Sequence, residues 1–230
     1  MNRSTRTARS DGEQTRVRLL EAAGKLFAAG GYAETTGKAI AAEAEVDLAS
    51  INYHFGGRSG LYQAVLVEAH RRLVTLLDLQ KIAASDLPAT AKFRSVIETL
   101  VAGSAEGAWH TRVLARELLA PSSHLQVLFR EEVAPKFAVV KGIISELTGI
   151  PETDPALLRC MVSVAAPCAM LLLVAPNMPG PFEEVLHAQR RTLAADLHAF
   201  LLGGLQALSH AYAGSPARKK PTKRTPRPHG

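Results

Sequence analysis

The chain has 230 residues, of which 47% are hydrophobic and only 5% aromatic, and its formal net charge is +6. A chain of this length can form one large domain, or a small domain joined to a larger one. Because the composition is rich in alanine and leucine and poor in aromatic residues, it favours packed helices over a sheet, and we expect an all-α protein.

Four helices are expected in the first 80 residues, over residues 13–30, 37–45, 48–53 and 58–79. Each has apolar residues at helical spacing, and glycine pairs end the first and the third. Thr36 can cap the second helix and Asp47 the third.

Five further helices are expected at residues 86–102, 105–119, 121–147, 156–175 and 182–211, with a loop at 177–182. Alternating apolar and polar residues, which would indicate strands, are absent from the sequence, and so are internal repeats. The prediction is therefore an all-α protein of about nine helices.

The longest apolar run, residues 160–175, is about 16 residues long and contains Pro167. A membrane span needs about 20 residues, so we expect a buried or interface helix and no membrane contact. Cys160 and Cys168 form no CxxC motif and complete no ligand set with the scattered histidines. We expect core thiols, with no metal and no cofactor.

The positive charge is concentrated at the two ends of the chain. Residues 1–10 carry three arginines and residues 215–230 carry six lysines or arginines, with no acidic residue in either segment. Such ends are typical of proteins that contact nucleic acid or a membrane surface, although a solubilising disordered tail has the same composition. The early arginines lead into Asp11 and Glu13 instead of an apolar run, so we expect a cytoplasmic protein.

The stretch VDLASINYHFGGRSG at residues 46–60 is typical of a helix that faces DNA. A helix that enters the major groove needs small side chains for close approach and polar ones that bond to base edges. Ala49, Ser50 and Asn52 meet this requirement, and Ile51 is expected to anchor the helix to the domain.

The residues that follow are suited to phosphate. Tyr53, His54 and Arg58 stand where side chains reach phosphate oxygens, and the backbone amides of Gly57 and Arg58 add an anion site. Taken alone, Tyr53 and Phe55 also fit as core aromatic residues. A metal-ligand role for His54 is not expected, because no His or Cys stands four residues further on.

Residues 15–66, TRVRLLEAAGKLFAAGGYAETTGKAIAAEAEVDLASINYHFGGRSGLYQAVL, resemble the N-terminal signature of the TetR/AcrR family of bacterial repressors. The resemblance implies a regulator that binds a palindromic double-stranded DNA operator as a homodimer and is released by a small molecule. An activator, or a non-specific architectural protein that acts through basic tails, remains an alternative. The resemblance places DNA contacts at Thr36, Lys38, Leu48, Ala49, Ser50, Asn52, Tyr53, His54, Gly57 and Arg58.

Two positions depart from the family pattern. Glu45 stands where the family usually has glycine in the turn, so we expect a left-handed backbone there at a cost of about 1 kcal/mol. Leu48 replaces a residue that is commonly polar, which leaves a methyl contact to thymine instead of a hydrogen bond.

The resemblance also implies a C-terminal domain that dimerises through its last two helices and encloses a ligand. WHTRVLARELLAPSSH and VAAPCAMLLLVAPNM are similar to the CecR (YbiH) branch. Candidate pocket residues are Phe93, Trp109, His110, Arg112, Arg116, Phe129, Phe137, Met161 and Cys168. Candidate dimer residues are Leu157, Met161, Leu172, Leu193, Leu197, Leu201, Gly204, Leu205 and Leu208.

The expected organisation is a helix-turn-helix domain, a connecting helix that an effector shifts, and an effector-binding and dimerisation domain, between two basic ends. Their bounds are a flexible arm at 1–12, the DNA-binding domain at 13–60, the connecting helix at 61–80, the C-terminal domain at 81–213 and a disordered tail at 214–230.

Enzyme motifs do not fit. One residue too many lies between Gly31 and Gly37 for a phosphate loop, and Ala39 stands where Ser or Thr would bind magnesium. GSAEG at 103–107 does not match the GxSxG motif of hydrolases. No enzymatic activity is predicted.

Overall fold

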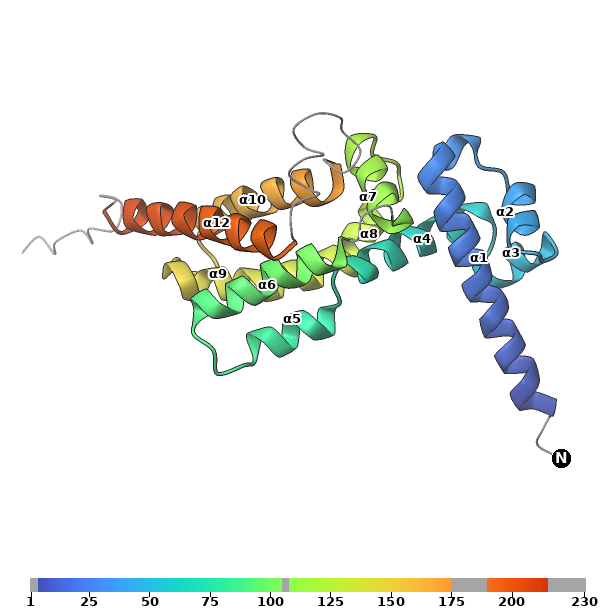
Figure 1. The fold of residues 1–230 in the computed structure, drawn as a ribbon, viewed down its shortest axis with the longest axis horizontal. Helices are drawn as coiled ribbons and strands as arrows, with labels where there is room; N and C mark the ends of the chain where they lie inside the picture. Colours follow the sequence, from blue (N-terminus) through green and yellow to red (C-terminus); the bar gives the residue numbers. More distant parts are fainter. Residues whose placement is uncertain (1–3, 105–107, 175–189, 215–230) are drawn as a thin grey trace, which may run out of the picture.

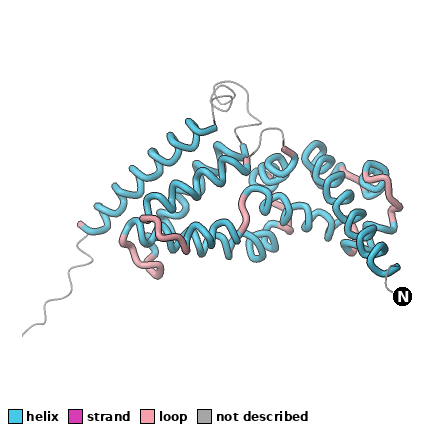
Figure 2. Tube along the Cα trace, turned by 60° about the horizontal axis from the view of Figure 1, so that its bottom comes forward, coloured by secondary structure: helices cyan, strands magenta, loops and turns pink. Residues whose placement is uncertain are grey.

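A computed structural model describes residues 4–104, 108–174 and 190–214 of the chain. Within these residues every regular element is a helix (Figure 2), so the all-α prediction is confirmed. The helices form an elongated molecule with α1 to α3 at one end and α12 reaching toward the other (Figure 1).

The N-terminal helices are α1 (Ser4–Glu34), α2 (Gly37–Glu43), α3 (Ala49–Phe55) and α4 (Arg58–Leu73). They are followed by α5 (Leu76–Ala83), α6 (Ala89–Gly103), α7 (Trp109–Leu119), α8 (Leu125–Leu128) and the π-helix η1 (Phe129–Val133). The last are α9 (Ala134–Thr148), α10 (Pro155–Ala169), the π-helix η2 (Met170–Val174) and α12 (Arg190–Ala213).

The first helix is longer than predicted. It begins at Ser4, so the expected flexible arm is helical from that residue on. Near its other end Gly31 leaves the helical conformation with φ 78°, which matches the predicted end at the glycine pair.

The connecting helix is shorter than predicted. It ends at Leu73, Val74 takes an extended backbone, and Thr75 begins α5 by accepting a hydrogen bond from the Asp78 amide at 3.1 Å. A threonine cap after a β-branched residue favours a new helix start over continuation. The prediction of one helix to residue 79 was therefore wrong.

The predicted caps of the short helices gave different outcomes. The Thr36 Oγ1 accepts from the Ala39 amide at 3.1 Å, which confirms that cap. The α3 cap is Leu48, which makes no side-chain cap bond, and Asp47 accepts from the Ser50 amide only through its backbone oxygen. Asp47 as a side-chain cap was therefore wrong.

The predicted helix at 121–147 is three elements, with the π-helix η1 directly before Pro135. Proline lacks the N–H that would continue the regular ladder, which favours a local change of hydrogen-bond pattern. A second π-helix, η2, lies after Pro167 instead of before it, so the missing N–H of that proline does not explain it. The loop expected at 177–182, the start of the last predicted helix and the basic tail from 215 lie outside the described residues.

Two hydrophobic cores organise the molecule. The first contains α1 to α4 together with α7 and α8, and the second contains α5, α6, α9, α10, η2 and α12. Trp109 and Val113 of α7 are part of the first core, together with residues such as Phe27 of α1 and Leu61 of α4. Helix α7, which the sequence placed in the C-terminal domain, therefore packs against the helices of the DNA-binding domain.

The segment Pro155–Val174 is long and apolar enough, by composition alone, to span a membrane. One side of it packs in the second core through Leu157, Cys160 and Val164. The opposite side of the helix is exposed, as is expected of a helix that takes part in an interface.

Candidate DNA-binding site

The turn between α2 and α3 is built from backbone bonds and a strained residue. The Val46 amide donates to the Ala41 oxygen at 3.0 Å, and Glu45 adopts φ 53°. The predicted left-handed glutamate is thus confirmed. Ile40 and Ile51 are both buried in the first core and hold the two helices against α1 and α4.

The side of α3 opposite Ile51 is open to solvent. Leu48, Ala49 and Asn52 are exposed there, and Ser50 is half-buried at the edge. The helix therefore presents small and polar side chains outward, as a helix that enters a major groove must.

Tyr53 is 85% exposed, so it is a surface residue, whereas Phe55 packs against the first core. The Tyr53 ring meets the half-buried His54 ring edge-on, with centroids 4.9 Å apart. Of the two interpretations that the sequence left open for these aromatic residues, the structure places Tyr53 outside and Phe55 inside.

The starts of α2 and α3 lie together. A Cβ added to Gly37 would be 3.2 Å from the Leu48 side chain, so no larger residue fits there without displacement. Thr36 and Lys38, both exposed, are thereby brought beside the first residues of α3.

Asn52 also lies near the start of α4. A Cβ on Gly57 would be 3.6 Å from the Asn52 Oδ1, and the left-handed Gly56 donates its amide to the Asn52 oxygen at 2.9 Å. The predicted contacts at Asn52 and Gly57 therefore share one edge of the domain.

Arg58 faces the protein instead of an open anion site. One guanidinium nitrogen donates to the backbone oxygens of Tyr32 at 2.7 Å and Thr35 at 2.8 Å. The guanidinium also stacks on the Tyr32 ring, 4.1 Å from its centroid. These contacts fasten α4 to the α1–α2 connection. The phosphate contact expected of Arg58 stays a prediction.

The nine predicted pocket residues do not surround one cavity. Four of them (Phe93, Phe137, Met161 and Cys168) pack in the second core. Trp109 and His110 are buried on α7, where the His110 Nε2 donates to the Gly103 oxygen at 2.9 Å. Arg112, Arg116 and Phe129 are exposed.

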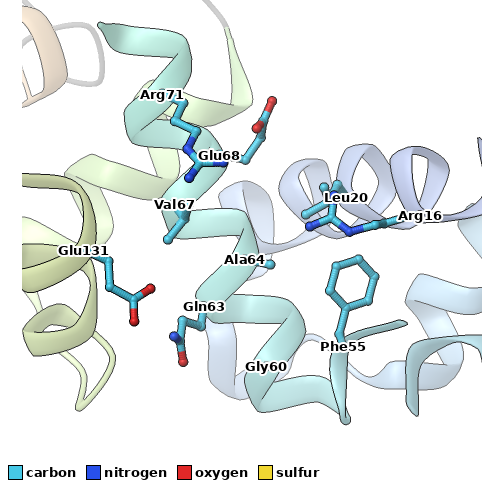
Figure 3. Close-up of a pocket in the computed structure, with 10 residues that line it drawn as sticks. All are labelled: Arg16, Leu20, Phe55, Gly60, Gln63, Ala64, Val67, Glu68, Arg71 and Glu131. Carbon is cyan, nitrogen blue, oxygen red and sulfur yellow. The ribbon is translucent and has the colours of Figure 1, made fainter. Parts of the chain in front are cut away.

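Two of the cavities among the described residues lie between helices elsewhere in the molecule. One of about 460 Å³ lies where α1 and α3 face η1 across α4, between Arg16, Phe55, Val67 and Glu131 (Figure 3). The Arg16 guanidinium stands over the Phe55 ring, 5.3 Å from the centroid. The other, of about 230 Å³, lies between α10 and the end of α12.

Most predicted dimer residues face the protomer's own core. Those that are buried in the second core are Leu157, Met161, Leu172, Leu197, Leu201 and Leu205, and Leu193 packs against it. Gly204 and Leu208 are exposed. In α10 the exposed apolar residues are instead Leu158 and Val162, which directly follow Leu157 and Met161 and are 53% and 58% exposed. The dimer face stays a prediction.

The exposed apolar side continues on α12. Phe200 is 72% exposed, and a Cβ on Gly203 or Gly204 would meet no atom within 4 Å. Sequence reasoning missed Leu158, Val162 and Phe200 because both sides of these helices are apolar, and periodicity alone does not say which side faces inward.

A buried polar cluster joins α4 to η1 and α9. The Lys136 Nζ donates to the His70 Nδ1 at 2.8 Å and lies 3.0 Å from the Glu132 carboxylate. The Arg71 Nε donates to the same carboxylate at 2.6 Å. Burial, together with the Lys136 charge, lowers the pKa of His70 to about 4, so this ring is neutral and accepts the lysine proton.

Two family models match the chain. Residues 19–65 match the model described as bacterial regulatory proteins of the tetR family. Residues 89–205, just over half of the chain, match the model described as the C-terminal domain of the HTH-type transcriptional dual regulator CecR. No curated protein matches the chain.

Solved structures of transcription regulators share the fold. The fatty acid degradation regulator FadR from Bacillus halodurans has 15% identity and a TM-score of 0.67, covering 84% of this chain and 96% of its own. FadR from Bacillus subtilis in complex with stearoyl-CoA has 16% identity and a TM-score of 0.66, covering 82% and 98%. HlyIIR, a hemolysin II transcriptional regulator, has 20% identity and a TM-score of 0.57, covering 85% and 98%.

Proposed function

We propose that this chain, which belongs to the TetR family of bacterial transcription regulators and carries a C-terminal domain of the CecR type, is a repressor that a small molecule releases from its operator. The family and the similar solved structures are transcription regulators, not enzymes. The repressor role, the effector and a cytoplasmic location are part of the proposal.

The observation that carries the proposal is the outward side of α3. Ile51 anchors the helix in the core while Ala49, Asn52 and Tyr53 face solvent, and Lys38 of α2 lies beside its first turn. The residues that we propose to contact the DNA backbone and those that we propose to contact the bases thus lie on one surface, which specific recognition requires.

The exposed apolar sides of α10 and α12 support the proposal of a dimer. Leu158 and Val162 of α10 and Phe200 of α12 are large apolar side chains that are exposed in the protomer. Exposed apolar patches on a protein surface mark sites of interaction with other molecules. Pairing of these two helices with a second copy would make a four-helix interface with twofold symmetry. Such a dimer presents two copies of α3 to a palindromic operator.

A small-molecule effector is supported by the fold. The Bacillus subtilis FadR structure holds stearoyl-CoA, and its fold is shared by this chain. We propose that the effector binds in the C-terminal domain and favours a state with lower DNA affinity, which requires tighter binding to that state.

The test of DNA recognition is fluorescence anisotropy on DNA from upstream of the protein's own gene against scrambled DNA, at about 0.15 M salt. We expect a preference of about a thousandfold. Tyr53→Ala should weaken operator binding at least about tenfold, since a base or phosphate contact contributes 1–3 kcal/mol. Leu77→Ala, which alters another exposed side chain, is the matched control. Equal binding to both DNAs by all variants would contradict operator recognition at this site.

The test of the effector uses stearoyl-CoA as the first probe and free coenzyme A as its control. A fall in operator affinity with stearoyl-CoA alone supports release by an acyl ligand, whereas a rise would make the protein a ligand-stabilised regulator. Unchanged affinity with both compounds excludes this ligand class.

A further inference from the structure

Helix α7 joins the DNA-binding domain to the rest of the molecule. One covalent connection runs from α4 through the extended residue Val74, which packs in the second core. A second connection is made by α7, which packs in the first core and lies beside α1 (Figure 1). Leu173 of η2 packs against the same core, so α7 stands between the C-terminal helices and α1.

One end of α7 is seated in a notch of α1. A Cβ on Gly24 would lie 2.5 Å from the Trp109 ring, so the indole occupies the space that any other residue at position 24 would fill. The indole Nε1 donates to the Glu21 carboxylate at 2.9 Å. Arg72 of α4 pairs with the same carboxylate and stacks on the indole, 4.8 Å from the ring.

The other end of α7 is tied to the end of α1. The Arg116 Nε donates to the Ala28 oxygen at 2.9 Å, and its second nitrogen donates to the Ala29 oxygen at 2.7 Å. Beside it the Tyr62 hydroxyl of α4 donates to the buried Glu117 carboxylate at 2.8 Å. Two attachments, one at each end of α7, prevent rotation of α1 against it.

We propose that α7 determines the half-site spacing that the dimer accepts, with Trp109 and Arg116 as positioning residues. The inference rests on the proposed function. The spacing that two copies of α3 can read is fixed by the angle between the DNA-binding domain and the dimer helices. Each added base pair turns the second half-site by about 35°, so a rigid attachment penalises a change of spacing.

The experiment begins with an operator that the wild-type chain selects from a random duplex library. Affinity is then measured on duplexes whose half-site spacing differs by one or two base pairs, and on duplexes with one substituted base in a half-site. The variant is Trp109→Phe with Arg116→Met, which keeps an aromatic ring but removes three donor bonds to α1. The control is Arg112→Met, which removes an exposed arginine of the same helix.

Wild type and control should lose at least about 100-fold in affinity for a change of two base pairs. The double variant should lose less than about tenfold, while its penalty for a substituted base stays that of wild type. A merely structural defect would lower both penalties or the affinity for every duplex. Gly24→Ala, which fills the notch, should relax the spacing penalty in the same way.

Trp109 is the single tryptophan of the chain, so its emission in Arg116→Met reports whether the indole stays seated. If both variants fold and keep the wild-type spacing penalty, the inference is overturned and the proposed function stands. If the wild-type chain selects no duplex, the proposed function fails and the inference fails with it.

Discussion

Arg58 illustrates how one residue type serves two roles at the same position. The family resemblance places a phosphate contact there, whereas in this chain the guanidinium binds the Tyr32 and Thr35 oxygens. An arginine can do this because its planar fork holds several donors in fixed directions, which a lysine lacks.

Arg58→Met should therefore destabilise the fold without changing the electrostatics of DNA binding. We expect the free energy of unfolding to fall by about 2 kcal/mol, since hydrogen bonds from a charged group contribute about 1.5–3 kcal/mol. The dependence of log K on log salt should keep its slope. Lys38→Met is the control: it should lower that slope by about 1 per protomer and leave urea unfolding unchanged. If Arg58→Met lowers the slope of log K against log salt, Arg58 contacts a phosphate in the complex with DNA.

His70 links stability to pH. Its pKa falls from 6.5 to about 4 on folding, so between these values the unfolded chain binds more protons and stability decreases as pH falls. Between pH 7 and pH 5 this residue should lower the free energy of unfolding of the wild type by about 2 kcal/mol.

His70→Asn should lose this part of the pH dependence. Urea unfolding at pH 7 and pH 5, at one protein concentration, measures the difference, and His210→Asn shows whether loss of an exposed histidine has the same effect. If the free energy of unfolding falls by the same amount from pH 7 to pH 5 in wild type and in His70→Asn, the His70 ring is not held neutral by burial.

At the scale of helices, register decides what a side chain does. In α10, Leu157 is buried and Leu158 is exposed, although both belong to one apolar run. The choice depends on which side meets α9 and α12, and no pattern within the run contains that information.

Phe200→Glu should convert the proposed dimer to a monomer. The side chain is exposed in the protomer, so its replacement leaves the cores intact but places a charge in the expected interface. Sedimentation at micromolar concentration measures the mass. The control Leu77→Glu, which places a glutamate at an exposed apolar position of α5, should stay dimeric. If Phe200→Glu is still a dimer, the dimer interface lies on another surface of the protomer.

At the scale of the whole molecule, we expect the basic segment at residues 215–230 to contribute charge to DNA binding without recognising a sequence. Its deletion should weaken binding to operator and scrambled DNA alike and reduce the salt slope, because fewer counterions are released. The ratio of the affinity for the operator to the affinity for scrambled DNA should stay unchanged. Loss of all binding on deletion, with Asn52→Ala harmless, would favour the architectural alternative.

The sequence alone determined the features that depend on neighbours in the chain. These are the all-helical fold, the Thr36 cap, the left-handed Glu45 and the exposed polar side of α3, because each follows from local sterics or from the spacing of apolar residues within one helix. Packing between distant segments decided the rest. Glu21 and Trp109 are 88 positions apart, yet their hydrogen bond attaches α7 to α1 of the DNA-binding domain. The break after Leu73, the direction of Arg58 and the exposed side of α10 depend in the same way on which surfaces meet, and helical periodicity within a segment does not specify its partner.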